Sequence, residues 1–513
     1  MDRRNFIKTG GAVALAAGLG STTAKGFVPD HVWDKYDFGS GPAVKNRLNQ
    51  GPFPTYPPEQ VVPGSDVVMM TTPSKQVVPN FGMGLITYMC DEVGPPKKEG
   101  ESLAQSLENL AKMTIGSKMY IRLDWKDLQK NPGKLELCEH WRLVLEMAQK
   151  YNKRIGFRVQ LQNPEIPGHA VPDFVADKVP FVKLGTTDQI GLRGKVQYIP
   201  RYDHPAFMSA LQEFDAMLAD MYNGHPLIEY MDTYMYGFWG EGHTWPFDGN
   251  PFPDYITAEQ TFTEIFEMQL QNWSKVPLTT NTQPDYSRVG NSELLDRTIR
   301  SHNWLRTDTI YIENTQIEAL SNRPPWIGAT IECGISDGAS ETSGMRDGIT
   351  RSDGIIYHAR DVGANYFSLW NWHRILADRI LNYYRQFPGA IDELDRCIGY
   401  RVRPSWIWHF EKDEHPGLVL GLVNDGIAGV PGVLYITVFS DDGKVNVCGG
   451  LDSGYPLPGK VRQAQVILPK GTEWKGLKVK AEIEVKGVRY PVRWACHQQT
   501  NPDGSLTLQP NLR

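Results

Sequence analysis

A short segment in the middle of the chain combines an acid, an imidazole and an indole with three glycines. Residues 237–243 read GFWGEGH, which places Glu241 and His243 next to Trp239. Glycine lets a ligand approach the backbone closely, an indole face binds the apolar face of a ring, and burial raises the pKa of a carboxyl group towards that of a general acid. We therefore expect Glu241 to be a catalytic acid, with Trp239 and His243 contacting the substrate.

A second carboxylate stands at the end of another β-prone run. Residues 326–334 read WIGATIECG, so Glu332 ends an apolar segment and is followed at once by small residues. Two opposed carboxylates can flank a glycosidic bond, one protonating the leaving oxygen while the other attacks or stabilises the anomeric carbon. We expect Glu332 to be the catalytic partner of Glu241. Glu313 and Asp232 are the alternative partners.

Other side chains at the ends of β-prone runs are of types that bind polar ligands, because they offer hydrogen bonds, charge or flat aromatic faces. His243 is expected to be a hydrogen-bonding contact rather than a metal ligand, since the sequence has no HxH or HExxH spacing, and we expect no metal and no cofactor. The residues expected to bind substrate are Arg122, Asp124, Arg158, Gln160, Asp232, Tyr236, Trp239, His243, Glu313, Trp370 and Trp372.

The elements that must position these residues alternate between short β-prone runs and longer helical stretches. Eight candidate strands cover residues 81–89, 119–124, 154–162, 227–239, 278–281, 309–313, 327–332 and 365–370. This order predicts an α/β fold, a TIM (β/α)₈ barrel over residues 79–399, whose catalytic groups sit at the C-terminal ends of the strands. A doubly wound open sheet is less favoured, because the sequence has no glycine-rich dinucleotide fingerprint in context.

The remaining segments have different characters. Residues 25–78 are rich in Pro and Gly and predict an extended lead-in, while residues 400–513 carry alternating strands and turns that predict a small antiparallel β-sandwich. The chain has 513 residues and a formal net charge of −6 without a basic cluster, which argues against nucleic acid as a partner. The six cysteines show no CxxC spacing, so neither a zinc site nor a disulfide scaffold is predicted.

The first 24 residues resemble a twin-arginine export signal. Arg3 and Arg4 precede Phe6, Ile7 and Lys8, and a mildly apolar run and small residues follow. The resemblance implies removal of residues 1–24 and a periplasmic or secreted protein. No later stretch approaches the ~20 apolar residues that a membrane helix requires.

With these motifs in place, residues 79–400 resemble the (β/α)₈ glycoside hydrolases of clan A, which include the family 42 beta-galactosidases. The resemblance implies that Glu241 is the acid/base at the end of strand four and Glu332 the nucleophile at the end of strand seven. It also matches Arg122 to an Arg at the end of strand two and Trp370 to a Trp at the end of strand eight. The sequence departs from the clan at Gly240, where the clan usually has an Asn that holds the sugar 2-hydroxyl.

Three other function classes remain open from the sequence. A lyase acting on uronate-containing polysaccharide would use Tyr234 or Tyr236 with His243 as acid and base, and Arg122 or Arg158 to neutralise the uronate. A non-catalytic carbohydrate-binding barrel would keep the fold without the chemistry. An exported nicotinamide oxidoreductase is the weakest alternative, because the glycine fingerprint is missing. In the favoured interpretation the partner of the protein is a carbohydrate substrate.

Overall fold

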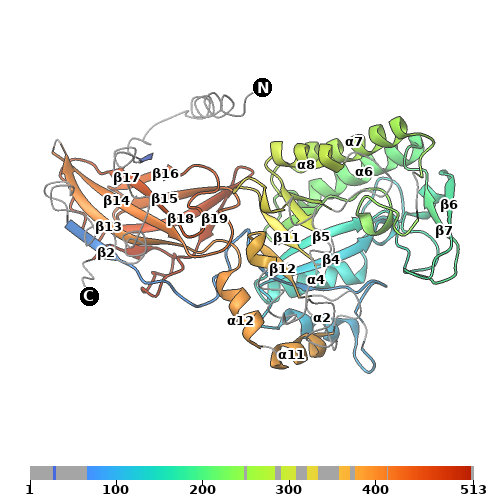
Figure 1. The fold of residues 1–513 in the computed structure, drawn as a ribbon, viewed down its shortest axis with the longest axis horizontal. Helices are drawn as coiled ribbons and strands as arrows, with labels where there is room; N and C mark the ends of the chain where they lie inside the picture. Colours follow the sequence, from blue (N-terminus) through green and yellow to red (C-terminus); the bar gives the residue numbers. More distant parts are fainter. Residues whose placement is uncertain are drawn as a thin grey trace.

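The structure is a computed structural model in which two bodies lie side by side, a barrel and a β-sandwich (Figure 1). It describes residues 27–29, 66–96, 98–247, 251–282, 291–307, 320–332, 358–369, 376–386, 388–412 and 414–509. In the part of the chain that is described, no helix combines the length and apolar character needed to cross a membrane.

Eight strands close into a barrel in the order β10-β11-β12-β3-β4-β5-β8-β9, and every neighbouring pair is parallel. This confirms the predicted TIM barrel. Its strands are β3 (Gly84–Tyr88), β4 (Lys118–Asp124), β5 (Arg154–Gln160), β8 (Ile228–Asp232), β9 (Leu278–Asn281), β10 (Trp304–Thr307), β11 (Ala329–Ile331) and β12 (Tyr366–Ser368). The sixth strand, β10, starts five residues before the run at 309–313 from which it was predicted, and that run lies outside the described residues.

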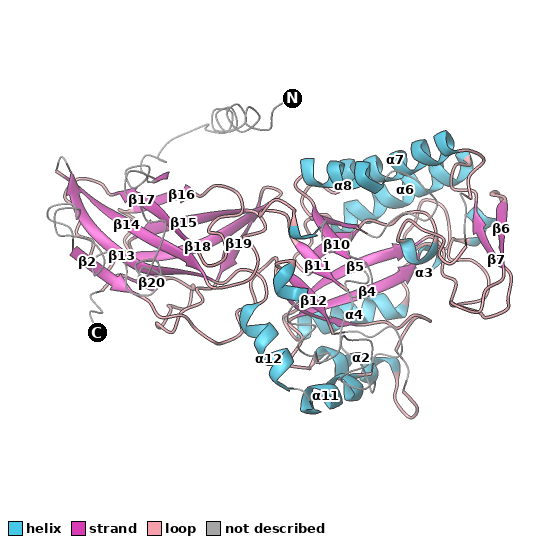
Figure 2. Ribbon diagram, viewed as in Figure 1, coloured by secondary structure: helices cyan, strands magenta, loops and turns pink. Residues whose placement is uncertain are grey.

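Helices cover the outside of the barrel (Figure 2). They form where apolar residues recur at three- and four-residue spacing, and α2 begins at a capping box in which Ser102 and Gln105 satisfy each other's backbone N–H groups. The helices are α2 (Leu103–Ala111), α3 (Trp125–Leu128), α4 (Glu139–Lys150), α5 (Asp173–Ala176), α6 (Pro205–Tyr222), α7 (Tyr255–Asn272), α8 (Asn291–Arg300), α11 (Ala377–Gln386) and α12 (Pro388–Cys397). A hairpin of β6 (Phe181–Gly185) and β7 (Gln197–Pro200) follows α5.

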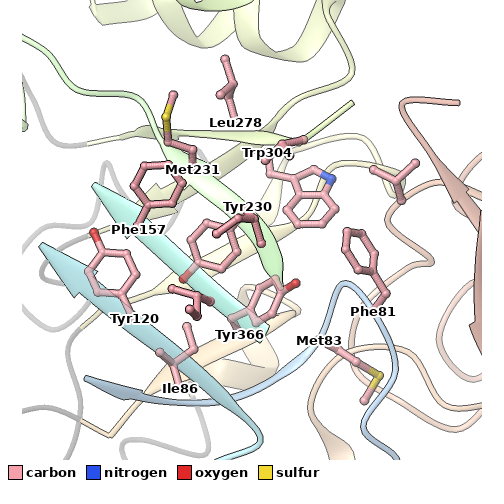
Figure 3. Close-up of a cluster of buried hydrophobic side chains, with 14 of the residues drawn as sticks. Phe81, Met83, Ile86, Tyr120, Phe157, Tyr230, Met231, Leu278, Trp304 and Tyr366 are labelled. Carbon is pink, nitrogen blue, oxygen red and sulfur yellow. The ribbon is translucent and has the colours of Figure 1, made fainter. Parts of the chain in front are cut away.

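The barrel interior contains a layer of aromatic rings below its C-terminal end (Figure 3). The ring centroids of Tyr230 and Tyr366 are 5.3 Å apart, those of Trp304 and Tyr366 6.0 Å, and those of Tyr120 and Tyr230 6.3 Å. Gly156 makes room for this layer, since a Cβ there would lie 2.3 Å from the Tyr230 ring. The packed layer excludes water from below and so strengthens the electrostatic contacts of the layer above it.

The C-terminal body consists of two antiparallel sheets, which confirms the predicted sandwich. One has the order β1-β17-β14-β13-β2, and the other β16-β15-β18-β19 with β20 beside β18. Two of its strands, β1 (Phe27–Pro29) and β2 (Asp66–Met70), come from the N-terminal lead-in. The others are β13 (Val402–Lys412), β14 (His415–Asn424), β15 (Val433–Phe439), β16 (Asn446–Gly450), β17 (Val461–Ile467), β18 (Lys478–Val485), β19 (Val488–Val492) and β20 (Leu506–Thr507).

The sandwich packs against the end of the barrel where the strands begin. Tyr490 of β19 stacks on Phe81, which precedes β3, with ring centroids 3.6 Å apart and an interplanar angle of 2°. The guanidinium of Arg154, the first residue of β5, lies 4.9 Å from the Tyr490 ring centroid. The opposite end of the barrel, where the strands finish, is therefore the end that carries the predicted site residues.

Candidate active site

The segment that carries Glu241 is a tight turn with unusual backbone angles. Gly237, Trp239, Gly240 and Gly242 all have positive φ, at 83°, 53°, 76° and 81°. Three of these positions are glycine, which adopts such angles at no steric cost, while Trp239 pays a conformational penalty that its surroundings must balance. Backbone strain of this kind is concentrated at ligand sites, so this turn is a candidate ligand site.

Gly240 could not be a larger residue without a rearrangement of the turn. A Cβ there would lie 2.8 Å from the carbonyl oxygen of Val159 and 3.2 Å from Cδ of Arg158. The backbone of Val159 and the side chain of Arg158, both on β5, therefore occupy the space that a side chain at position 240 would need. An Asn at this position, as the clan A resemblance implied, would not fit without a rearrangement.

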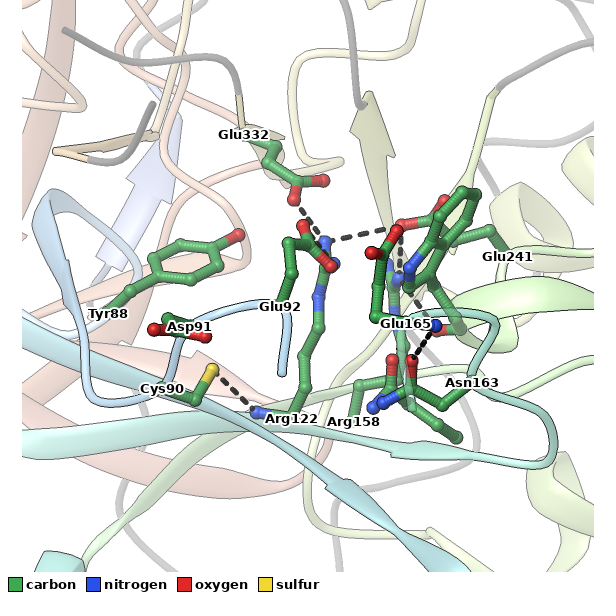
Figure 4. Close-up of polar contacts among 12 residues, drawn as sticks. Tyr88, Cys90, Asp91, Glu92, Arg122, Arg158, Asn163, Glu165, Glu241 and Glu332 are labelled. Carbon is green, nitrogen blue, oxygen red and sulfur yellow. Dashed lines mark hydrogen bonds and ion pairs between the residues drawn. The ribbon is translucent and has the colours of Figure 1, made fainter. Parts of the chain in front are cut away.

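Three arginines from three barrel strands form the centre of the site, and Figure 4 shows two of them, Arg122 and Arg158. Arg122 of β4, Arg158 of β5 and Arg306 of β10 are 7%, 1% and 1% exposed. Buried charges are stable only when they are paired, and here the carboxylates of Asp232, Glu241 and Glu332 balance them. Desolvation opposes the charge of Arg122, but Glu241 and Glu92 outweigh it and raise its pKa.

Glu241 and Glu332 both bind the same nitrogen of Arg122. Nη2 of Arg122 lies 3.2 Å from Oε1 of Glu241 and also donates a hydrogen bond to Oε1 of Glu332. Nη2 of Arg306 binds the other oxygen of Glu332, and Nη1 of Arg158 lies 2.6 Å from Oε1 of Glu241. The structure therefore brings together the two carboxylates predicted to be catalytic, together with Arg122 and Arg158.

His243 holds the second oxygen of Glu241. Its Nδ1 accepts a hydrogen bond from the backbone N–H of Trp245 at 3.3 Å, so the proton of the neutral imidazole is on Nε2. That nitrogen lies 3.2 Å from Oε2 of Glu241 and donates to it. The carboxyl group of Glu241 is thus fixed from both sides, by arginine on one oxygen and by histidine on the other.

Asp232 lies in the same layer, and both of its carboxylate oxygens are bound by side chains of other barrel strands. It accepts hydrogen bonds from the hydroxyls of Tyr120 and Thr279, and Arg158 and Arg306 each lie 3.1 Å from its Oδ2. Desolvation raises the pKa of Asp232, and Arg158 acts against that shift. With 1% of its side chain exposed, Asp232 is placed to orient two arginines.

Asp124 and Gln160 form a separate contact one step nearer the strand ends. They are register partners on β4 and β5, and Nε2 of Gln160 donates to Oδ1 of Asp124 at 3.1 Å. Asn163 donates to the same oxygen at 3.4 Å. Burial, with a smaller contribution from the charge of Asp127, raises the pKa of Asp124 to about 7.

Three of the predicted substrate-binding residues, Glu313, Trp370 and Trp372, lie outside the described residues. Trp239 is half-buried, its ring centroid lies 5.9 Å from that of His243, and its indole N–H has no acceptor among the described residues. Tyr236 is fully buried, and its ring contacts Tyr202, Phe252 and Phe262.

Tyr234, the alternative tyrosine for a lyase, is also held inside the fold. Tyr234 is fully buried, and its hydroxyl donates to Asp215 of α6. The placement of Tyr234 and Tyr236 therefore does not favour the lyase alternative. Within the described ranges, no three His, Cys, Asp or Glu side chains are grouped so that they could hold a metal ion.

Two residues of the cluster were not found from the sequence. Arg306 was overlooked because the sixth strand was placed too late in the chain, so the arginine fell before it. Glu92 follows the first strand within four residues, and the same rule that selected Glu332, a carboxylate just past a strand end, would have selected it. Glu92 lies beside Arg122, with Oε1 3.6 Å from Nη1 (Figure 4).

Residues 1–20 match the family described as TAT (twin-arginine translocation) pathway signal sequence. The chain thus carries a signal for export across the cytoplasmic membrane, as the sequence predicted. No curated protein matches the sequence.

Solved structures with a similar backbone include endo-glycoceramidase II from Rhodococcus sp., at 11% identity and a TM-score of 0.36 over 79% of this chain and 100% of that one. A family 39 glycoside hydrolase from Bacteroides cellulosilyticus WH2 has 10% identity and a TM-score of 0.37 over 76% of this chain and 82% of that one. A beta-galactosidase from Rahnella sp. R3 has 12% identity and a TM-score of 0.37 over 65% of this chain and 59% of that one. The barrel itself is established by the strand pairing described above.

Proposed function

We propose that this protein is an exported glycoside hydrolase that cleaves a glycosidic bond in an oligo- or polysaccharide, with Glu332 as nucleophile and Glu241 as acid/base. The observation that carries the proposal is the shared contact of both carboxylates with Nη2 of Arg122. Two carboxyl groups from different strands converge at the catalytic end of a barrel, which is the arrangement that glycoside hydrolysis needs. We place its site of action in the periplasm or outside the cell.

The shared nitrogen favours a retaining mechanism. Two hydrogen bonds of at most ~3.2 Å to one nitrogen place the two oxygens within about 6.4 Å of each other. Retaining enzymes hold their carboxyl groups roughly 5–5.5 Å apart, whereas inverting enzymes need roughly 6.5–9.5 Å to admit a water molecule. This limit applies to the two nearest oxygens, and their close contact is the observation on which we propose direct attack by a carboxylate.

In the first step, Glu241 must enter as a protonated carboxylic acid. A carboxylate oxygen of Glu332 bonds to the anomeric carbon while the bond to the leaving oxygen breaks and Glu241 gives that oxygen its proton. In the second step, water attacks the anomeric carbon, Glu241 takes a proton from the water, and the ester bond to Glu332 breaks. Once Glu332 is an ester, Arg122 and Arg306 have one carboxylate fewer to balance. The negative charge of Glu332 then no longer opposes ionisation of Glu241, so the ionised form of Glu241, which is the form needed to act as base, is favoured.

The test uses a panel of 4-nitrophenyl glycosides of common hexoses, pentoses and uronates in both anomeric forms. We expect the protein without its signal segment to release nitrophenol from at least one of them. We expect the Glu332→Gln and Glu241→Gln variants to lose at least ~10³-fold in kcat on that glycoside. No release from any glycoside, or full activity in Glu332→Gln, would overturn the proposal.

Chemical trapping identifies the nucleophile independently. A 2-deoxy-2-fluoro glycoside with a dinitrophenyl leaving group slows the second step and leaves the sugar bonded to the enzyme. We expect peptide mass spectrometry to find the added sugar on Glu332. A label on Asp232 or Glu241 would assign the nucleophile differently.

A further inference from the structure

We propose that Glu92 is a further substrate-binding residue, which holds a hydroxyl group of the sugar at the mouth of the barrel by hydrogen bonds. This inference rests on the proposed function of the same site. Glu92 belongs to the loop after β3, whereas the two proposed catalytic carboxylates follow β8 and β11. A ligand between them would therefore be contacted from a third side of the barrel.

The first observation is that the backbone holds Glu92 in a fixed position. Glu92 lies in a turn that two backbone hydrogen bonds close, from Asp91 N to Gly94 O at 2.8 Å and from Gly94 N to Asp91 O at 3.2 Å. The carboxylate of Asp91 also accepts from the backbone N–H of Val93 at 2.8 Å. A side chain on a closed turn loses less conformational freedom on binding a ligand than one on an open loop.

The second observation is that Glu92 adjoins the catalytic pair through one guanidinium group. Arg122 contacts Glu92 through Nη1 at 3.6 Å, and Glu241 and Glu332 through Nη2. The width of a guanidinium group thus separates Glu92 from the proposed reaction centre, which places its carboxyl group within reach of a sugar ring held there (Figure 4).

The third observation is exposure. The side chain of Glu92 is 21% exposed, compared with 7% for Arg122 and Glu241 and 2% for Glu332. Among these four side chains, Glu92 is the one that an entering ligand meets first. A partly exposed carboxyl group beside a buried ion cluster is suited to binding a polar ligand group.

The protonation state of Glu92 fits a hydroxyl partner. Although 21% of its side chain is exposed, the protein around Glu92 removes most of the water from its carboxyl group, and this desolvation raises its pKa to about 8, with Arg122 acting against the shift and the charges of Glu241, Glu165 and Asp91 adding to it. At neutral pH the group is then mainly a carboxylic acid, which both donates and accepts a hydrogen bond. A sugar hydroxyl has the same two capacities.

The experiment compares Glu92→Ala and Glu92→Gln with the wild type on the glycoside that the panel identifies. The matched control is Glu393→Gln, which alters a Glu–Arg pair on the barrel exterior, where Glu393 and Arg360 are 41% and 48% exposed. For Glu92→Ala we expect kcat/KM to fall about 10- to 100-fold, mainly through KM, because a hydrogen bond to the substrate is lost. Glu92→Gln, which keeps a donor and an acceptor, should retain most of the wild-type value at pH 6.

A pH profile distinguishes a binding role from a structural one. We expect kcat/KM of the wild type to fall above pH 8 as Glu92 ionises, and the ratio of Glu92→Gln to wild type to rise over the same range. The charged groups facing Glu92 are Arg122 from β4, Glu241 from the loop after β8, Glu165 from the loop after β5 and its neighbour Asp91. Because these four groups are present in both proteins, the ratio of the two kcat/KM values reports on the residue at position 92.

If Glu92→Ala has the kinetics of Glu393→Gln, the inference about Glu92 is wrong while the proposed function stands. If the wild type cleaves no glycoside, the proposed function fails. Binding of the same glycosides, measured by saturation-transfer NMR, then tests whether Glu92 contacts a sugar. Binding to the wild type that is lost in Glu92→Ala supports the inference without turnover. Binding that is equal in the two proteins, or absent from both, refutes it.

Discussion

Arg306 offers the sharpest test of how the site is built, and the test does not depend on a substrate. Its guanidinium is 1% exposed, lies 3.1 Å from Asp232 and binds Glu332. The Arg306→Met change preserves much of the side-chain volume but leaves two buried carboxylates, with Arg158 as the arginine beside Asp232 and Arg122 as the one beside Glu332.

Removing one partner of a buried ion pair costs about 3–5 kcal/mol, because the charge left behind is poorly solvated. With a slope of about 3 kcal/mol per molar urea, a loss of about 4 kcal/mol lowers the unfolding midpoint by roughly 1.3 M. The assay is urea unfolding followed by tryptophan fluorescence, which reports on the barrel through buried indoles such as Trp304.

The matched control is Arg300→Met on α8, where the arginine is 77% exposed and pairs with Asp296. An exposed pair contributes at most about 1 kcal/mol, so its midpoint should move by less than about 0.3 M. Adding Asp232→Asn to Arg306→Met should recover part of the loss, because one unbalanced charge disappears. Equal midpoints for Arg306→Met and Arg300→Met would refute the electrostatic account of this layer.

Three further predictions test the turn, the buried Asp124 and the histidine. Gly240→Ala should destabilise the fold by at least ~1 kcal/mol more than Gly100→Ala, because both positions have positive φ but an added Cβ meets a neighbour only at 240. Thermal unfolding compares the two variants, and equal losses of stability would argue against the clash. For Asp124, whose pKa is raised to about 7, the folded state holds a proton that the unfolded state loses near pH 4, so native stability falls as pH rises from about 4 to 7. The Asp124→Asn variant should therefore gain stability relative to wild type between pH 5 and pH 8 in thermal scans, and a constant difference would contradict the raised pKa. His243→Ala should lower kcat about 10- to 100-fold on a cleaved glycoside with a smaller change in KM, because the hydrogen bond to Glu241 is lost; a change in KM alone would assign His243 to substrate binding instead.

Much of the architecture follows from local patterns in the chain. Buried strands of a parallel barrel appear as short apolar runs between amphipathic helices, and this alternation located six barrel strands to within a few residues. The strand predicted at 227–239 was too long, because β8 ends at Asp232 and the glycine-rich segment after it turns instead of continuing the strand. The other exception was β10, where Trp304–Thr307 was passed over for the apolar run that follows it. The rule that chemistry sits at the strand ends then selected Arg122, Arg158, Glu241 and Glu332 from the sequence alone.

What the sequence could not decide is which of these groups meet. Arg122 and Glu332 are 210 positions apart, and their hydrogen bond exists because barrel closure brings β4 and β11 around one axis. The choice among Glu332, Asp232 and Glu313 as the partner of Glu241 is of the same kind, and Glu313 lies outside the described residues. Asp232 and Glu332 are each bound to two arginines, and Glu332 also shares Nη2 of Arg122 with Glu241, which is why we propose Glu332.

The sequence by itself determined the fold class, the export signal and the residue types available for chemistry, because these depend on periodicity and short motifs. Tertiary structure alone decided that Val159 and Arg158 fill the space beside Gly240, that Glu92 adjoins Arg122, and that β1 and β2 join the C-terminal sandwich. The physical reason is that contacts between distant segments depend on packing and charge balance across the closed barrel, which no local pattern records.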